Sequence, residues 1–251
     1  MENSNSNIAG TPTLSREQAP TQTGAALDLL RKALAITAKD VRVEMRTREL
    51  LSSMFIFALI MSVLFNYTLD LKPTQIEDVA SGLLWMVFAF SGVLGLNRIF
   101  TSESESGTLQ GLLVAPLDRS ALYIGKLLST VIFVLVTQVI NVPIFALFAN
   151  LSFANLLALA PVFALGTLGF AAVGTLFAAI AANTRMREVM LPILLLPLTM
   201  PVLLACIELT GTALRGQSLD TARQWLSLLL AYDVIFVVVG ALIFEVITQE
   251  D

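Results

Sequence analysis

Long apolar runs separated by short polar segments make up most of the chain after residue 50. A helix needs roughly 20 predominantly apolar residues to cross the hydrocarbon core of a bilayer, and these runs are close to that length. Helices satisfy their own backbone hydrogen bonds, so they can carry such runs through lipid. The pattern predicts an all-α, polytopic membrane protein with six spanning helices, at residues 50–67, 83–100, 122–148, 156–182, 189–207 and 229–248.

The segment before the first apolar run has two patterns of its own. Residues 1–24 are rich in Ser, Asn, Thr, Gln and Pro, so we expect a disordered tail that buries too little apolar surface to fold. Residues 25–49 repeat apolar side chains at steps of three and four among many basic ones, which predicts an amphipathic helix. Such a helix fits the membrane surface, and packing on a soluble partner is the alternative. Residues 50–251 then form one six-span domain.

A polar stretch between the second and third runs, residues 98–126, has the features of a short surface helix. Acidic and hydroxyl side chains at its start suit a helix N-terminus, leucines follow at helical spacing, and Pro116 ends the helix. It is either a solvated connector between two spans or a docking element that transmits force from a soluble partner. The residues that would dock are Glu103, Glu105, Gly107, Thr108, Leu109, Gln110, Leu112, Leu113 and Pro116.

The fifth run differs from the others because it contains Pro192, Pro197 and Pro201. Proline removes a backbone donor and clashes with the preceding turn, so a straight helix is not expected here. We predict a kinked or partly unwound span, a feature that usually lines a cavity or a moving part such as a gate. Residues 208–227 then mix charged, glycine and apolar positions, and we expect them to form a re-entrant or surface hairpin on the outer side.

Polar and small side chains inside the third and fourth runs predict contacts between helices. Gln138 and Asn141 must face protein or a cavity, and interhelical hydrogen bonding and a substrate path are equally compatible with them. Lys126, near the start of the third run, is expected to extend to the membrane surface. Glycines in the fourth run, Gly166 and Gly169 among them, predict close packing of helix backbones.

Two acidic residues lie in the last run, where a carboxylate is costly and suggests a function or a partner. We expect Glu245 about one turn inside the inner end, paired with Arg98 or with an arginine just before the first span. We expect Asp233 about one turn inside the outer end, paired with Arg215 or Arg223 in preference to a transport role. The alternative hypothesis is that Asp233 helps to hold an outer gate.

Composition supports the membrane class and limits the chemistry. The chain is 56% hydrophobic and 14% charged, with a mean hydropathy of +0.81, whereas soluble domains carry roughly 25% charged residues. It has no histidine and a single cysteine, and no G-x-x-x-x-G-K-[ST] sequence occurs in it. We therefore assign no catalytic, cofactor-binding or metal-binding residue and expect a non-enzymatic subunit that binds no nucleic acid.

Basic residues are distributed unevenly between the two sides of the predicted bundle. Of the 15 lysines and arginines, all but Lys72, Arg215 and Arg223 fall in segments on the side of the two termini. The positive-inside rule places that side in the cytoplasm, together with the polar stretch at 98–126. A soluble partner in the cytoplasm could therefore reach the predicted surface helix.

The polar stretch resembles the cytoplasmic loop of ABC-2-type permeases, in the order Glu105-Ser-Gly107-Thr108-Leu109-Gln110, Leu112-Leu113, Ala115-Pro116 and Gly125-Lys126. In that family the loop carries a coupling helix that seats in a groove of an ATPase subunit. Other segments resemble the heme exporter protein B family, or CcmB family, of bacterial cytochrome c maturation. They are Arg42 to Leu50, Gly82 to Trp85, Leu96 to Pro116, Leu196 to Val202, Tyr232-Asp233 and Phe244-Glu245.

The resemblance implies a permease of the bacterial inner membrane, with both termini cytoplasmic. It implies a partner ATPase of the CcmA type that binds the ATP, heme-handling subunits of the CcmC and CcmD types, and a periplasmic heme chaperone. Heme would then be a transported or handled ligand, and a second copy of the chain is a further candidate partner. The alternatives are an ABC-2 permease for a lipid, polysaccharide or drug, and an autonomous secondary transporter.

Overall fold

A computed structural model describes residues 22–68, 73–105, 119–149, 159–182 and 186–247 of the chain. These ranges contain helices and no strand, so the all-α class is confirmed. The α-helices have the bounds α1 Gln22–Thr47, α2 Glu49–Thr68, α3 Pro73–Glu105, α5 Arg119–Phe148, α6 Ala160–Ala182, α7 Arg187–Leu214 and α8 Arg223–Ile247, and the short 3₁₀ helix η3 is Leu219–Ala222.

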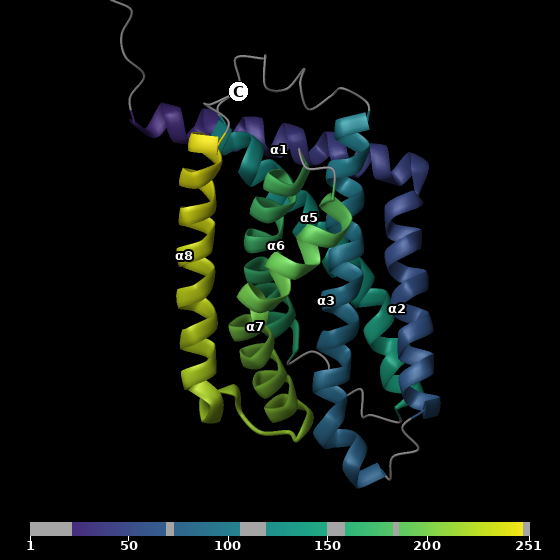
Figure 1. Ribbon diagram of the computed structural model, residues 1–251. Coiled ribbons are helices and arrows are strands. Elements are labelled where there is room, and N and C mark those ends of the chain that lie inside the picture. Colours follow the sequence, from purple (N-terminus) through teal and green to yellow (C-terminus); the bar gives the residue numbers. More distant parts are fainter. Residues whose placement is uncertain (1–21, 69–72, 106–118, 150–158, 183–185, 248–251) are drawn as a thin grey trace, which may run out of the picture.

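The helices α2, α3, α5, α6, α7 and α8 run side by side as a bundle, and α1 lies across one end of it (Figure 1). We call this the α1 end and the opposite one the far end. In the described part of the chain, six helices are long and apolar enough to cross a membrane. The predicted six-span architecture is thereby confirmed, and the helix predicted at residues 25–49 is present as α1.

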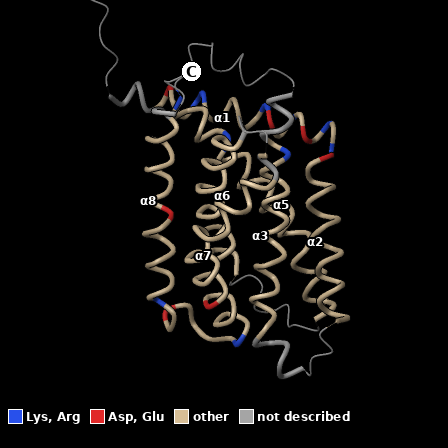
Figure 2. Tube along the Cα trace, in the orientation of Figure 1, with Lys and Arg blue, Asp and Glu red and all other residues tan. Residues whose placement is uncertain are grey.

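Most charged residues lie near the two ends of the bundle, which leaves its length largely free of charge (Figure 2). At the far end, Arg215 follows the last residue of α7, Asp220 lies in η3 and Arg223 is the first residue of α8. The remaining described basic residues belong to α1, the α1–α2 corner, the first residue of α7 and the parts of α3 and α5 nearest α1. This distribution is what a bundle embedded in lipid requires, because an unpaired charge in hydrocarbon is costly.

Helices α3 and α6 form the centre of the bundle. In the apolar stretch of each, 67% of the residues are buried inside the protein, compared with 22% in the apolar stretches of α2 and α8. Glycines bring α6 close to its neighbours, as the sequence predicts. A Cβ atom added at Gly166 would lie 2.3 Å from the sulfur of Cys206, and one at Gly174 would lie 2.4 Å from Leu96 Cδ1. Because lipid is as apolar as leucine, such close packing replaces the hydrophobic effect as the main attraction between spans.

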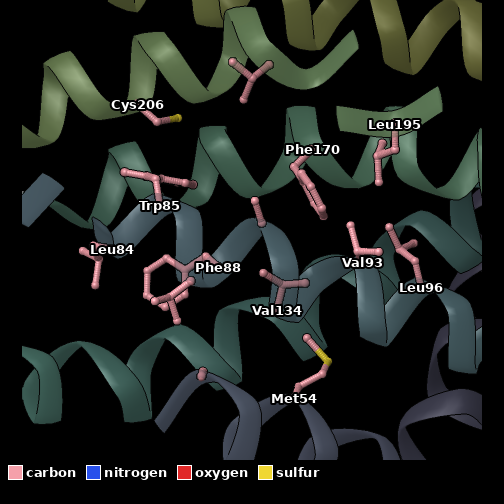
Figure 3. Close-up of a cluster of buried hydrophobic side chains, with 14 of the residues drawn as sticks. Met54, Leu84, Trp85, Phe88, Val93, Leu96, Val134, Phe170, Leu195 and Cys206 are labelled. Atoms are coloured by element: carbon pink, nitrogen blue, oxygen red, sulfur yellow. The ribbon is translucent and has the colours of Figure 1, made fainter. Parts of the chain in front are cut away.

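The core between the central helices is built from aromatic and branched side chains (Figure 3). Trp85 and Phe88 of α3 pack edge to face with ring centroids 6.0 Å apart, and both rings contact Phe163 of α6. The indole nitrogen of Trp85 donates a hydrogen bond of 2.9 Å to Thr210 Oγ1 of α7. The core therefore joins three helices through both ring packing and a satisfied buried donor.

The region after the fifth span differs from its prediction. The helix α7 continues to Leu214 and α8 already begins at Arg223, so most of residues 208–227 lies inside these two helices. The predicted re-entrant or surface hairpin is therefore not confirmed, and charged positions such as Glu208 lie on an exposed face of a continuing helix. The link that remains is a short turn closed by Gly216, whose φ of 67° suits a residue without a Cβ, followed by η3.

The three prolines do not interrupt α7, which is recorded as one helix through Pro192, Pro197 and Pro201. The partly unwound alternative is therefore wrong, and the predicted kink stays a prediction. Each proline still removes one backbone donor from the helix. Next to Pro197, the Leu198 carbonyl oxygen accepts a hydrogen bond of 2.8 Å from Tyr232 Oη of α8, which joins the two helices at this level.

Candidate functional site

The predicted docking helix lies between two elements that the structure brings to the α1 end. Helix α3 ends there at Glu105, and α5 begins there at Arg119 (Figure 1). Glu103 and Glu105 fall in the last turn of α3, and their side chains lie outside the described residues. The other predicted docking residues also lie outside them: Gly107, Thr108, Leu109, Gln110, Leu112, Leu113 and Pro116.

Helix α1 is fixed to α5 by a buried polar contact that we call the α1–α5 junction. Lys126 Nζ lies 2.9 Å from Asp40 Oδ2, and Ser129 Oγ donates to the same oxygen at 3.0 Å. Thr37 Oγ1 donates to the Gly125 carbonyl at 3.0 Å. Lys126 is 2% exposed, so its predicted extension to the membrane surface is wrong. Its partner carboxylate comes from α1, and a buried ion pair of this kind holds the two helices in one register.

Close backbone contact makes the α1–α5 junction possible. A Cβ atom at Gly125 would lie 2.8 Å from Ile36 Cβ and 3.0 Å from the Ala33 carbonyl oxygen. Any side chain at this position would push α1 away from α5 and lengthen the contact between Asp40 and Lys126. The sequence analysis did not predict this junction. Asp40, an acid in the basic segment 25–49, and Lys126, a lysine at the start of a span, could have indicated that the two residues pair.

A sharp corner joins α1 to α2 and sets α1 across the bundle. Arg48 has a φ of 57°, which is uncommon for a residue with a side chain. The buried Glu44 stabilises the corner, because its Oε1 accepts a hydrogen bond of 2.8 Å from the Leu51 N–H in the first turn of α2. Beside it, Glu49 of α2 forms an exposed ion pair with Arg98 of α3. The corner therefore joins α1 to α2, and the first residue of α2 is in turn paired with α3.

The second region of interest is the α6–α7–α8 junction around Asp233. Asp233 lies ten residues after the first residue of α8, or about 15 Å along the helix, so it is well inside the span rather than one turn from its end. Its side chain is 3% exposed and lies against α6, where a Cβ at Gly169 would come 2.4 Å from Asp233 Oδ1. The same Cβ would lie 3.1 Å from Val202 of α7.

Asp233 has no cation beside it in the described part of the chain. Neither of its carboxylate oxygens has a hydrogen-bond partner there, so the predicted pairing with Arg215 or Arg223 is wrong. The reason is distance along the helix, because α8 starts earlier than predicted and leaves both arginines at the far end. Of the other predicted gate residues, Pro201 directly precedes Val202, and Pro197 and Pro192 lie nearer the first residue of α7. The side chain of Glu245 is outside the described residues.

A third buried polar group joins α5 to α2 and α6. Ser62 Oγ lies 3.1 Å from Asn141 Oδ1, and Thr167 Oγ1 donates to Gln138 Oε1 at 3.1 Å. Interhelical hydrogen bonding, one of the two alternatives for these amides, is therefore present. The amide nitrogens of both side chains have no partner within the described residues. No cluster of His, Cys, Asp or Glu suited to a metal occurs in that same part of the chain.

Comparison with known proteins assigns these features to one family. The profile described as "CcmB protein" matches residues 31–246, which run from α1 to the last turn of α8. The chain belongs to the CcmB protein family. Heme exporter protein B of Rhodobacter capsulatus is 28% identical over 193 residues, which is 77% of this chain and 88% of the relative. Heme exporter protein B of Pseudomonas aeruginosa is 25% identical over 196 residues, or 78% and 88% of the two chains.

A third relative extends the similarity to another bacterium. Heme exporter protein B of Paracoccus denitrificans is 26% identical over 193 residues, covering 77% of this chain and 88% of its own length. The resemblance to the CcmB family that the sequence motifs indicate is therefore confirmed. The matched range contains both junctions and the segment between α3 and α5, so the family comparison covers every part of the candidate site.

Proposed function

We propose that this chain is the permease subunit of a bacterial heme export system for cytochrome c maturation. In this proposal it converts ATP hydrolysis by a separate ATPase subunit into heme delivery or into release of a heme-loaded chaperone. The observation that carries the proposal is membership of the CcmB family, together with relatives named heme exporter protein B. The six spans and the two helix ends that flank the loop at the α1 end support the coupling role.

The contacts of the bundle suggest how movement at the loop would spread. The loop joins α3 to α5, and α5 is tied to α1 through Asp40 and Lys126. Further along, α5 is tied to α6 through Gln138 and Thr167, and α6 meets α7 and α8 at Gly169. A displacement of the loop would therefore move α5 and α6 first and reach the Asp233 region through α6. Asp233 and the proline-bearing α7 are the part of this path that we propose as the gate.

The proposed orientation puts the α1 end in the cytoplasm of a bacterial inner membrane. Within the described chain, the far end carries Arg215 and Arg223 as its basic residues, while those of α1 lie at the opposite end (Figure 2). This asymmetry supports the positive-inside assignment. The proposed partners are a CcmA-type ATPase at the α1 end, CcmC- and CcmD-type subunits in the membrane, a periplasmic heme chaperone and, as a further candidate, a second copy of this chain.

The direct test is purification of the chain from native membranes and identification of what accompanies it. We expect an ATPase subunit, and we expect Leu112→Ala to lower the turnover of that ATPase in the complex several-fold. Leu147→Ala is the matched control, because Leu147 lies on an exposed face of α5 and should leave turnover unchanged. Heme bound to the periplasmic chaperone, measured by its absorption, should fall with the first variant and not with the second.

Two results would contradict the proposal in different ways. Absence of an ATPase from the purified complex, with transport retained, would favour an autonomous transporter. Loss of ATPase turnover in Leu112→Ala without any change in heme on the chaperone would keep the coupling role but point to another substrate.

A further inference from the structure

Helix α1 has three faces, and the first is the one packed on the bundle. Its buried or half-buried members repeat at helical spacing and meet α5 and the start of α2; they are Ala33, Ile36, Thr37, Asp40 and Glu44. Because polar bonds at Thr37, Asp40 and Glu44 hold this face, α1 cannot rotate about its own axis without breaking them. The directions of the other two faces are therefore fixed relative to the bundle.

The second face is an exposed apolar stripe whose residues are three, four or seven positions apart. It contains Leu27, Leu30, Leu34, Ala38 and Met45. Leu34 is 58% exposed and Met45 is 68% exposed, so the bundle leaves most of their surface uncovered. An exposed apolar stripe of this length is best satisfied by an apolar neighbour.

The third face is basic. Arg31 and Arg42 are eleven residues apart, which is about three helical turns, and Arg46 follows one turn later. All three side chains are exposed, and none forms an ion pair with a residue of the described chain. The protein as a whole carries a formal net charge of −4, so any attraction of these arginines for an anion is local rather than a property of the whole molecule.

We propose that α1 is a binding surface for anionic phospholipid at the α1 end of the bundle. The leucine stripe would lie at the boundary between headgroups and acyl chains, and the guanidinium groups of Arg31, Arg42 and Arg46 would bind lipid phosphates. A bilayer offers an apolar layer and an anionic layer in that order, and the two exposed faces of a helix lying across the span ends match it. This inference does not depend on heme or on ATP coupling.

The test uses the full chain reconstituted in vesicles of phosphatidylcholine with phosphatidylglycerol. Electron paramagnetic resonance of spin-labelled phosphatidylglycerol and of spin-labelled phosphatidylcholine gives the relative association of each lipid with the protein. We expect the anionic lipid to be preferred, and R31Q/R42Q/R46Q to reduce the preference at least about fivefold. Fivefold corresponds to the ~1 kcal/mol expected for one arginine near an anionic surface. The control R215Q/R223Q removes basic charge from the far end and should not reduce the preference for the anionic lipid.

Two further measurements decide the remaining cases. The charge-conserving variant R31K/R42K/R46K should retain most of the preference for the anionic lipid. If it loses as much of that preference as the glutamine variant, the cause is damage to folding rather than loss of charge, and the proposal is overturned.

A spin label at Leu34→Cys in a Cys206→Ser chain should be reached by oxygen and not by a water-soluble nickel complex. A water-exposed label that becomes shielded only when the ATPase is added would also overturn it, in favour of a protein partner.

Discussion

Asp40, whose side chain is 9% exposed, and Asp233, which is 3% exposed, are two largely buried carboxylates with opposite surroundings. Asp40 has Lys126 at 2.9 Å and Ser129 at 3.0 Å, so its charge is balanced and its oxygen is hydrogen-bonded. Asp233 lies among Gly169, Val202 and its own helix, and neither of its oxygens has a partner in the described chain. Both residues sit where helices meet, so burial alone does not account for the difference.

The comparison separates a fixed contact from one that is free to change. Losing Lys126 would leave the nearly buried Asp40 with the partly exposed Lys39 as its remaining cation in the described chain, which makes the α1–α5 junction costly to open. Asp233 itself forms no hydrogen bond to α6 or α7 in the described chain, and the bond beside it, from Tyr232 Oη to the Leu198 oxygen, joins α8 to α7 rather than to α6. The α1–α5 junction is thus suited to carry a displacement without deforming, and the α6–α7–α8 junction is suited to respond to it.

The largest effect is expected from Lys126→Met, which removes the nearer and more deeply buried of the two cations beside Asp40. We expect the free energy of unfolding to fall by about 3–5 kcal/mol, as for other buried pairs that lose one member. Denaturant unfolding of the purified protein in detergent measures it. Lys39→Met is the matched control, because Lys39 also contacts Asp40, at 3.4 Å, but is 41% exposed, and its loss should cost less than ~1 kcal/mol.

A double variant sharpens the same measurement. Replacing both partners, in Asp40→Leu with Lys126→Met, removes the charges together and should recover most of the lost stability. If the single and double variants are equally unstable, packing at Gly125 rather than the ion pair holds α1 in place.

An intermediate effect is expected from Asp233→Asn, which should change coupled ATPase turnover more than it changes stability. Asparagine keeps the shape of the side chain and removes a carboxylate without a cation partner, so we expect stability within about 1 kcal/mol of the parent or above it. If the carboxylate holds the gate, ATPase turnover coupled to heme delivery should fall several-fold. Asp40→Asn serves as the comparison, since it should lower stability markedly. Full transport activity in Asp233→Asn would remove the gate hypothesis.

The number of spans and the helix before them could be predicted because apolar length and helical period are local properties of a sequence. The partner of Lys126 could not, because Asp40 approaches it only when α1 folds back across the bundle at Arg48. The position of Asp233 was misjudged for a related reason. Leu226, Leu228 and other apolar residues extend α8 back to Arg223, whereas the charges between 208 and 227 indicated a break in the spans.

The smallest effect is expected from Glu49→Gln, which tests an exposed carboxylate that does have a partner. Glu49 is paired with Arg98, but both side chains are more than half exposed, so water and salt screen the pair and it should contribute below ~1 kcal/mol. Arg98→Gln removes the same pair and keeps Glu49 in the first turn of α2, where its charge also opposes the helix dipole. Glu49→Gln should therefore be the more destabilising of the two, and the difference between them should shrink in high salt. An effect as large as that of Lys126→Met would mean that partners matter more than burial, and would reverse the interpretation of the two aspartates.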